Sequence, residues 1–191
     1  MEKYEFPDYT HLAKPNARYA MIGNIHGFFF NSQGVPLLTV GPHWTFFAGL
    51  NCFIFFLALI FIFVISPSVS NLNTVIGTVI FGFLMTNYVL AGLSNPGIPK
   101  SRVPDEGDLD PVDSEFQENY CKVCDVLMEE GTKHCEDCGV CIEELDHHCP
   151  WTSKCVGKGN LSYFYGFLLG ILFTFIYIVV TLGLKTKYEH Q

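Results

Sequence analysis

Three apolar stretches without a charged side chain constrain the fold of this chain more than any other feature. They cover residues 44–65, 72–93 and 161–184. Each is about 20 residues or longer, which lets a helix cross the ~30 Å hydrocarbon core of a bilayer. Three buried helices of a soluble core are the alternative, but the remaining polar sequence is too short to cover them. The sequence therefore predicts an α-helical multi-pass membrane protein with three transmembrane helices.

The sequence outside these helices has four parts. They are a polar N-terminal segment (1–43), an acidic linker (94–120), a cysteine-rich domain (121–160) and a short tail (185–191). The net charge of −8 comes largely from the linker, and an acidic balance without a basic stripe argues against a nucleic-acid partner. The first residues have no basic flank before an apolar run, so no signal peptide is predicted. Membrane lipid is the expected surrounding.

The distribution of basic residues predicts the orientation in the membrane. Lysine and arginine occur before the first apolar stretch and between the second and third, whereas the turn between the first two stretches has none. The positive-inside rule then places the N-terminus and the cysteine-rich domain in the cytosol.

Seven of the eight cysteines lie between Cys121 and Cys155, five of them in C-x2-C spacing, and three histidines are interspersed among them. This spacing is typical of zinc sites, and it suits zinc better than disulfides because the cytosol is reducing. The eighth, Cys52, is interpreted as an ordinary apolar thiol within a helix. Isolated His26 and His43 are expected to be interfacial or exposed rather than metal ligands.

Two tetrahedral zinc ions would use eight of the ten candidate ligands in this domain. If each site takes three cysteines and one histidine, one cysteine and one histidine remain, which is the composition of a nucleophile and its base. In an extended segment His147 and Cys149 share a face, while His148 turns to the opposite side. Asp146 is placed to hold the imidazole tautomer, and a neighbouring histidine favours the thiolate form of a cysteine. The alternative is that all these residues are structural.

The run Asp146-His147-His148-Cys149-Pro150-Trp151, with Asn160 and Phe164 after it, resembles the DHHC family of zinc-containing protein S-acyltransferases, or palmitoyltransferases. The similarity begins at Asn95-Pro96-Gly97. It implies one zinc held by Cys121, Cys124, His134 and Cys141, and a second held by Cys135, Cys138, His148 and Cys155. It also implies Cys149 as the acylated nucleophile, His147 as its base and Asp146 as the orienting partner. The implied donor is a fatty acyl-CoA, the implied acceptors are protein cysteines, and the implied location is an endomembrane.

The chain departs from the family pattern in two respects. Met128, Glu129 and Gly131 stand where the family usually has a basic-proline pair and an arginine. Lys133, Lys154 and Lys158 are therefore the candidates for binding CoA phosphates. The family typically has a fourth span, so the sequence resembles a member truncated after the third. These departures motivate a second hypothesis: a catalytically silent zinc-binding accessory subunit of a larger membrane complex, with other subunits covering the third span.

Overall fold

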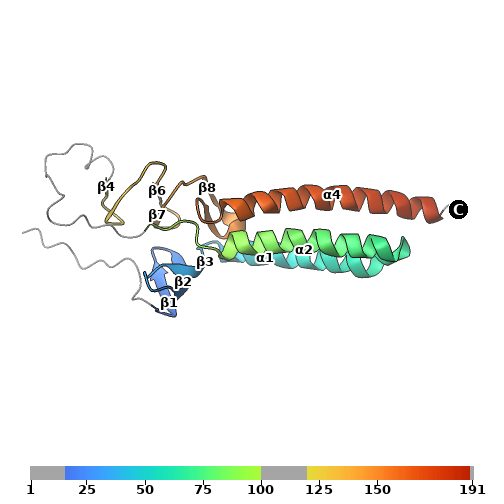
Figure 1. Cartoon of the computed structure of the whole chain (residues 1–191), viewed down its shortest axis with the longest axis horizontal. Coiled ribbons are helices and arrows are strands. Elements are labelled where there is room, and N and C mark those ends of the chain that lie inside the picture. The colour runs from blue at the N-terminus through green and yellow to red at the C-terminus, as the bar shows by residue number, and fades with distance from the viewer. Residues whose placement is uncertain (1–15, 100–119, 190–191) are drawn as a thin grey trace, which may run out of the picture.

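The structure of this chain is a computed structural model that describes residues 16–99 and 120–189. Most of the predicted acidic linker lies outside the described residues. Long helices run side by side, and all of the β-structure gathers at one end of them (Figure 1).

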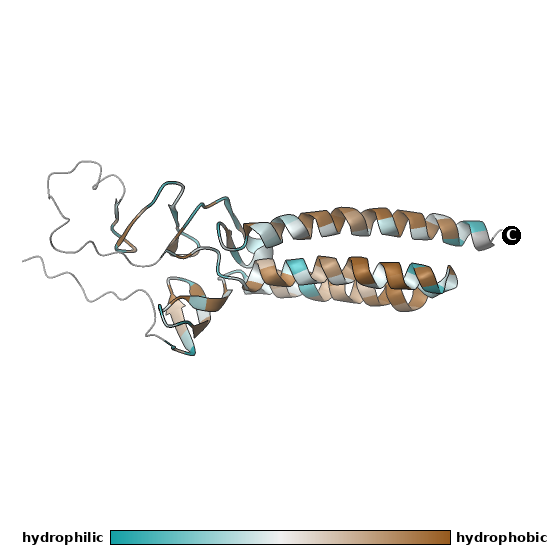
Figure 2. Cartoon of the chain, viewed as in Figure 1, coloured by the Kyte–Doolittle hydropathy of each residue, from teal (hydrophilic) through white to brown (hydrophobic). Residues whose placement is uncertain are grey.

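Three long helices confirm the predicted class of membrane protein. Helix α1 (Trp44–Ile60) continues through a π-helical turn (Phe61–Ile65) and a 3-10 turn (Ser66–Ser68). Helices α2 (Asn71–Leu93) and α4 (Leu161–Glu189) complete the set. The segments Trp44–Ser68, Asn71–Leu93 and Leu161–Lys187 are long and apolar enough to cross a membrane. Apolar residues dominate all three helices in Figure 2, whereas the β-rich end is mixed.

A capping serine begins helix α2, and a proline prevents the helix from continuing. The Ser70 hydroxyl accepts a hydrogen bond from the Asn73 backbone N–H at 3.1 Å, which satisfies one of the unpaired donors of the first turn. Pro96, two residues beyond Ser94, cannot continue a helix. Asn95 Oδ1 instead accepts the N–H groups of Gly97 at 2.9 Å and Ile98 at 3.0 Å. This turn leads the chain directly from the membrane to the cysteine-rich domain.

Small residues let α2 and α4 approach closely. A Cβ atom added at Gly170 of α4 would lie 2.9 Å from Leu84 Cα of α2, and one added at Gly77 would lie 2.3 Å from the Tyr177 hydroxyl. Such contacts drive helix association in membranes, where lipid removes the hydrophobic driving force. The Tyr177 hydroxyl also contacts the Ser66 hydroxyl, and it donates to the Asn73 carbonyl at 3.2 Å.

A three-stranded antiparallel sheet precedes α1. It consists of β1 (Tyr19–Ile22), β2 (Ile25–Phe30) and β3 (Pro36–Val40), in that order. Its β1–β2 turn docks on the cysteine-rich domain, because the Asn24 backbone N–H donates to the Cys138 carbonyl at 2.8 Å. The Asn24 side chain also donates to the Asp137 carbonyl at 3.0 Å. The adjacent Gly23 has φ +55° and leaves no room for a Cβ atom. This sheet therefore connects the zinc-ligand region to the start of α1.

We expect Gly170→Ala to lower the thermal unfolding midpoint in detergent, because the added methyl group overpacks against α2 at a cost of about 1–3 kcal/mol. Gly183→Ala is the matched control, since it makes the same change in α4 where nothing lies within 4 Å. Unfolding followed by circular dichroism measures both midpoints. Equal midpoints for the two variants would contradict the close α2–α4 packing.

Candidate active site and metal centres

Three short antiparallel hairpins form the cysteine-rich domain. They pair β4 (Tyr120–Cys121) with β5 (Val126–Leu127), β6 (Lys133–Cys135) with β7 (Val140–Ile142), and β8 (His147–Cys149) with β9 (Lys154–Val156). Strands of two or three residues are too short to be stable alone in water. The hairpins therefore need another source of stability.

The hairpins bring eight cysteine and histidine side chains into two tight clusters. Zinc site 1 consists of Cys121, Cys124, His134 and Cys141, and zinc site 2 consists of Cys135, Cys138, His148 and Cys155. Within each cluster the ligand atoms all lie within 4.8 Å of one another. These are the same two sets that the family resemblance implies.

Strand register explains why the two sites interleave. His134 lies directly opposite Cys141 in the β6–β7 hairpin, and His148 lies directly opposite Cys155 in the β8–β9 hairpin. Successive residues of a strand face opposite sides. His134 therefore joins zinc site 1 while its neighbour Cys135 joins zinc site 2. The β6–β7 hairpin supplies ligands to both sites and links them into one unit.

The cluster geometry fits tetrahedral zinc. Zn–S bonds of about 2.3 Å and Zn–N bonds of about 2.05 Å place nitrogen and sulfur about 3.6 Å apart in a tetrahedron. In zinc site 2, His148 Nδ1 lies 3.4 Å from Cys135 Sγ, 3.4 Å from Cys138 Sγ and 3.6 Å from Cys155 Sγ. The corresponding distances from His134 Nδ1 in zinc site 1 are 3.2 to 3.9 Å.

Some of the clustered thiols also have a lowered pKa, which favours metal binding. A hydrogen bond with Cys141 lowers the pKa of Cys124 to about 5, and one with Cys155 lowers the pKa of Cys138 to about 6. Each cluster thus favours at least one thiolate, the form of cysteine that binds metal. The two clusters are positioned to bind structural zinc ions, each through three sulfurs and one nitrogen.

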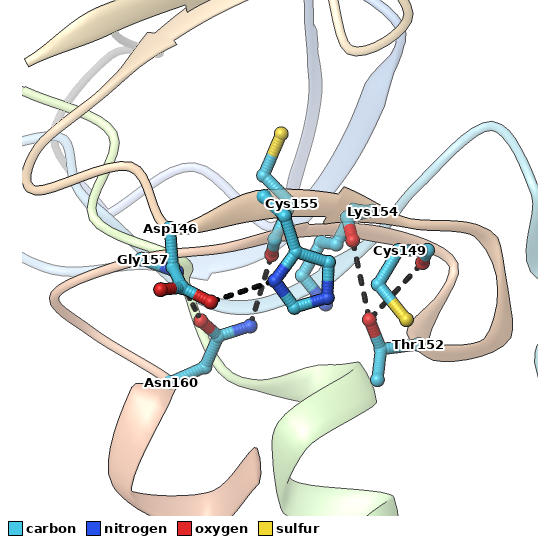
Figure 3. A network of polar contacts seen from close by, with 8 residues as sticks. Asp146, Cys149, Thr152, Lys154, Cys155, Gly157 and Asn160 are labelled. Carbon is cyan, nitrogen blue, oxygen red and sulfur yellow. Dashed lines mark hydrogen bonds and ion pairs between the residues drawn. The ribbon is translucent and has the colours of Figure 1, made fainter.

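The candidate catalytic residues lie on the other face of β8. In residues 120–160, all of which the structure describes, Cys149 is the one cysteine outside the two zinc sites. Its side chain is buried, at 8% exposure. His147 Nδ1 lies 2.7 Å from Asp146 Oδ2, and its ring meets the ring of Phe164 edge-on at a centroid distance of 5.1 Å. Figure 3 shows Asp146 bonded to an imidazole and, separately, the Cys149 carbonyl accepting a hydrogen bond from the Thr152 hydroxyl.

The β8–β9 hairpin is fastened to the helix ends. The Tyr88 hydroxyl of α2 donates to the Trp151 carbonyl at 2.6 Å. Ser153, at the hairpin turn with φ +72°, accepts the Gly41 N–H on its hydroxyl at 3.1 Å and the His43 N–H on its carbonyl at 3.1 Å. These contacts hold Cys149 at the end of the helical bundle.

Asn160 joins α4 to the same hairpin. Its fully buried amide donates to the Cys155 carbonyl at 3.1 Å and to the Ala91 carbonyl of α2 at 3.0 Å. Its Oδ1 accepts the Gly157 N–H at 2.9 Å (Figure 3). The side chain therefore closes the connection between zinc site 2 and two of the helices.

The three lysines expected to bind CoA phosphates have different environments. Lys154 is fully buried, and its ammonium donates to the Thr39 carbonyl at 3.2 Å and to the Gly92 carbonyl. Burial lowers the pKa of Lys154 to about 7. This placement contradicts a phosphate-binding role for Lys154, because the side chain is occupied within the fold.

The other two lysines lie at the surface. Lys158 Nζ is 3.4 Å from both a Glu143 and a Glu144 carboxylate oxygen, so acidic groups already neutralise its charge. Lys133 is exposed on β6.

One contact of a zinc-site residue was not predicted from the sequence. His43 is half-buried, and its Nδ1 lies 3.1 Å from Nε2 of the zinc ligand His148. His43 belongs to neither ligand set, as expected, and only its contact with a ligand was not predicted. The two residues are 105 positions apart, and no local pattern around His43 signals the contact.

Zinc removal should unfold residues 121–155, because such short hairpins have little apolar core of their own. We expect exhaustive chelation to make this segment sensitive to a protease that spares the untreated protein, and restored zinc to reverse the effect. Peptide mapping by mass spectrometry locates the cuts. Protease resistance that persists after measured loss of zinc would contradict this dependence.

Comparison with known proteins agrees with this geometry. Residues 114–190 match the family described as DHHC palmitoyltransferase. Palmitoyltransferase ZDHHC9 of Homo sapiens is 29% identical over 141 residues, covering 59% of this chain and 39% of the relative. Palmitoyltransferase ZDHHC18-A of Danio rerio is 30% identical over 139 residues, covering 59% of this chain and 30% of the relative.

A third relative, palmitoyltransferase ZDHHC14 of Mus musculus, is 29% identical over 129 residues, covering 54% of this chain and 26% of the relative. The chain thus spans between about a quarter and two fifths of the length of these curated relatives. With two zinc-ligand clusters and the Asp146-His147-His148-Cys149 strand in one structure, residues 114–190 of this chain match the DHHC palmitoyltransferase family.

Proposed function

We propose that this protein is a protein S-acyltransferase, which moves a fatty acyl group from acyl-CoA to protein cysteines through an acyl-Cys149 intermediate. The observation that carries the proposal is the spare pair on β8. Once two zinc ions have taken eight ligands, Cys149 and His147 remain on the face of the strand opposite His148. A nucleophile beside its base is the arrangement that covalent catalysis requires.

Asp146 orients the base. A carboxylate oxygen 2.7 Å from His147 Nδ1 keeps the proton on that nitrogen, which leaves Nε2 as the atom that accepts a proton. Phe164 packs against the same ring and limits its rotation. Both contacts hold the imidazole ready for proton transfer.

The reaction has two thioester exchanges. In the first, His147 accepts the thiol proton of Cys149, the thiolate attacks the acyl-CoA carbonyl, and the CoA thiolate leaves with the proton from His147. In the second, His147 accepts the proton of a substrate cysteine, whose thiolate attacks the acyl-Cys149 carbonyl; the released Cys149 takes the proton back. A thioester breaks and another forms in each step, so the overall exchange is close to thermoneutral. Positioning and exclusion of water are then the main tasks of the protein.

The location of Cys149 suits an acyl substrate. Its hairpin is bonded to α2 through Tyr88 and to the start of α1 through Ser153. A fatty chain can therefore remain in the apolar phase while its thioester meets the thiol. Zinc site 2 holds the opposite face of β8 and has no direct part in the chemistry.

We do not favour the silent accessory-subunit hypothesis, because the site retains the thiol, the histidine and its hydrogen-bonded carboxylate. We further propose that the zinc domain faces the cytosol, in agreement with the positive-inside distribution of lysine and arginine. Lys133 is the exposed cation that remains of the three proposed for CoA phosphates.

Purified protein incubated with radiolabelled palmitoyl-CoA should acquire an acyl label that neutral hydroxylamine removes, because the product is a thioester. Cys149→Ala should abolish the label. Cys52→Ala is the matched control, since Cys52 is a thiol within the membrane helix α1 that belongs to neither zinc site, and it should label as the wild type does. Equal labelling of Cys149→Ala and the wild type would overturn the proposal.

His147→Ala should slow acyl loading about 100-fold or more, the usual contribution of a positioned general base. Zinc content should stay at the wild-type level, because His147 belongs to neither ligand set. Rapid-quench labelling measures the rate, and metal analysis by mass spectrometry measures zinc. A wild-type loading rate in this variant would remove His147 from the mechanism.

Orientation can be tested by inserting an N-glycosylation acceptor loop either at Ser68 in the α1–α2 turn or after Glu130 in the zinc domain. With the zinc domain in the cytosol, only the Ser68 insertion reaches the lumen and gains a glycan. A mobility shift removed by endoglycosidase reports the glycan. Glycosylation at Glu130 instead would reverse the proposed topology.

A further inference from the structure

We propose that His43 is a positioning residue for zinc site 2, which it serves by accepting a hydrogen bond from the ligand His148. His43 Nδ1 lies 3.1 Å from His148 Nε2, and the two rings meet edge-on at a centroid distance of 5.1 Å. The proposal concerns zinc binding and does not depend on acyl transfer.

The role of each nitrogen follows from the geometry of zinc site 2. The three sulfurs of the site surround His148 Nδ1 at 3.4 to 3.6 Å, so Nδ1 is the atom that faces the metal. A neutral imidazole that binds metal through Nδ1 carries its proton on Nε2. The proton between the two rings therefore belongs to His148, and His43 Nδ1 is the acceptor.

The backbone holds His43 in place for this contact. Its N–H donates to the Ser153 carbonyl at 3.1 Å, and its carbonyl accepts the Phe46 N–H at 3.1 Å in the first turn of α1. His43 occupies the N-cap position of α1, but its side chain makes no capping hydrogen bond. The imidazole is thus available to His148.

Such outer partners fix the orientation of a metal-binding imidazole and raise its affinity, typically by 10–100-fold. Here the partner comes from the start of the first membrane helix. Because His148 occupies the middle of β8, the contact also ties the orientation of this strand to α1. The first helix is thereby coupled to zinc site 2 through one hydrogen bond.

The contact can be tested by following alkylation of each cysteine by mass spectrometry under limited chelator, because zinc-bound thiolates are protected. His43→Ala should make Cys135, Cys138 and Cys155 react about 10–100-fold faster. The cysteines of zinc site 1 should initially keep the wild-type rate. His26→Ala is the matched control, because His26 is a half-buried histidine of β2 that bonds to Tyr19 and not to a ligand.

His43→Asn separates the hydrogen bond from general loss of structure. Asparagine Oδ1 occupies the place of histidine Nδ1, two bonds from Cβ, and accepts a hydrogen bond in the same way. We expect this variant to stay within a few-fold of the wild-type rate. The proposal fails if His43→Asn reacts as fast as His43→Ala, if His43→Ala reacts as the wild type does, or if both zinc sites of His43→Ala open in parallel from the start.

Discussion

Coordination of zinc by three sulfurs and one nitrogen, repeated twice, is the interaction on which the extramembrane part of this protein depends. The strands of the cysteine-rich domain have two or three residues each, and the apolar cluster around zinc site 1 is small. Two metal ions replace the core that such a domain cannot build. Because the β6–β7 hairpin supplies ligands to both sites, it joins the two sites in one unit. The N-terminal sheet and the helix ends then dock on this unit.

Strand alternation also positions the residues that we propose to be catalytic. On β8, His148 faces zinc site 2 while His147 and Cys149 face the opposite side. One short strand thereby separates a zinc ligand from the proposed nucleophile and its proposed base. Zinc at site 2 would restrain this strand from the face opposite Cys149, and Tyr88 and Asn160 bond the β8–β9 hairpin to the helix ends. Because side chains alternate along β8, a zinc ligand and the proposed catalytic residues can lie on opposite faces of the same strand.

Local patterns in the sequence were sufficient for the three helices and for the presence of a zinc domain with a spare cysteine. They depend on apolar runs, C-x2-C spacing and alternation, all of which act over a few residues. Local patterns could not reveal the contact of His43 with His148 or the burial of Lys154, whose partners lie 105, 115 and 62 positions away. From the sequence alone, a lysine that donates to buried carbonyls cannot be distinguished from one that binds phosphate. Only the packing of the helix ends against the hairpins distinguishes the two.

The central claim is that two zinc ions occupy eight ligands and leave Cys149 as a usable thiol. Native protein should contain two zinc ions per chain. Treated with iodoacetamide, it should be modified at Cys149, slowly because this residue is buried, while the six ligand cysteines stay protected. Peptide mapping after metal analysis gives both results from one sample. Protection of Cys149 to the same degree as the ligands, or modification of a ligand cysteine at full zinc content, would contradict the account.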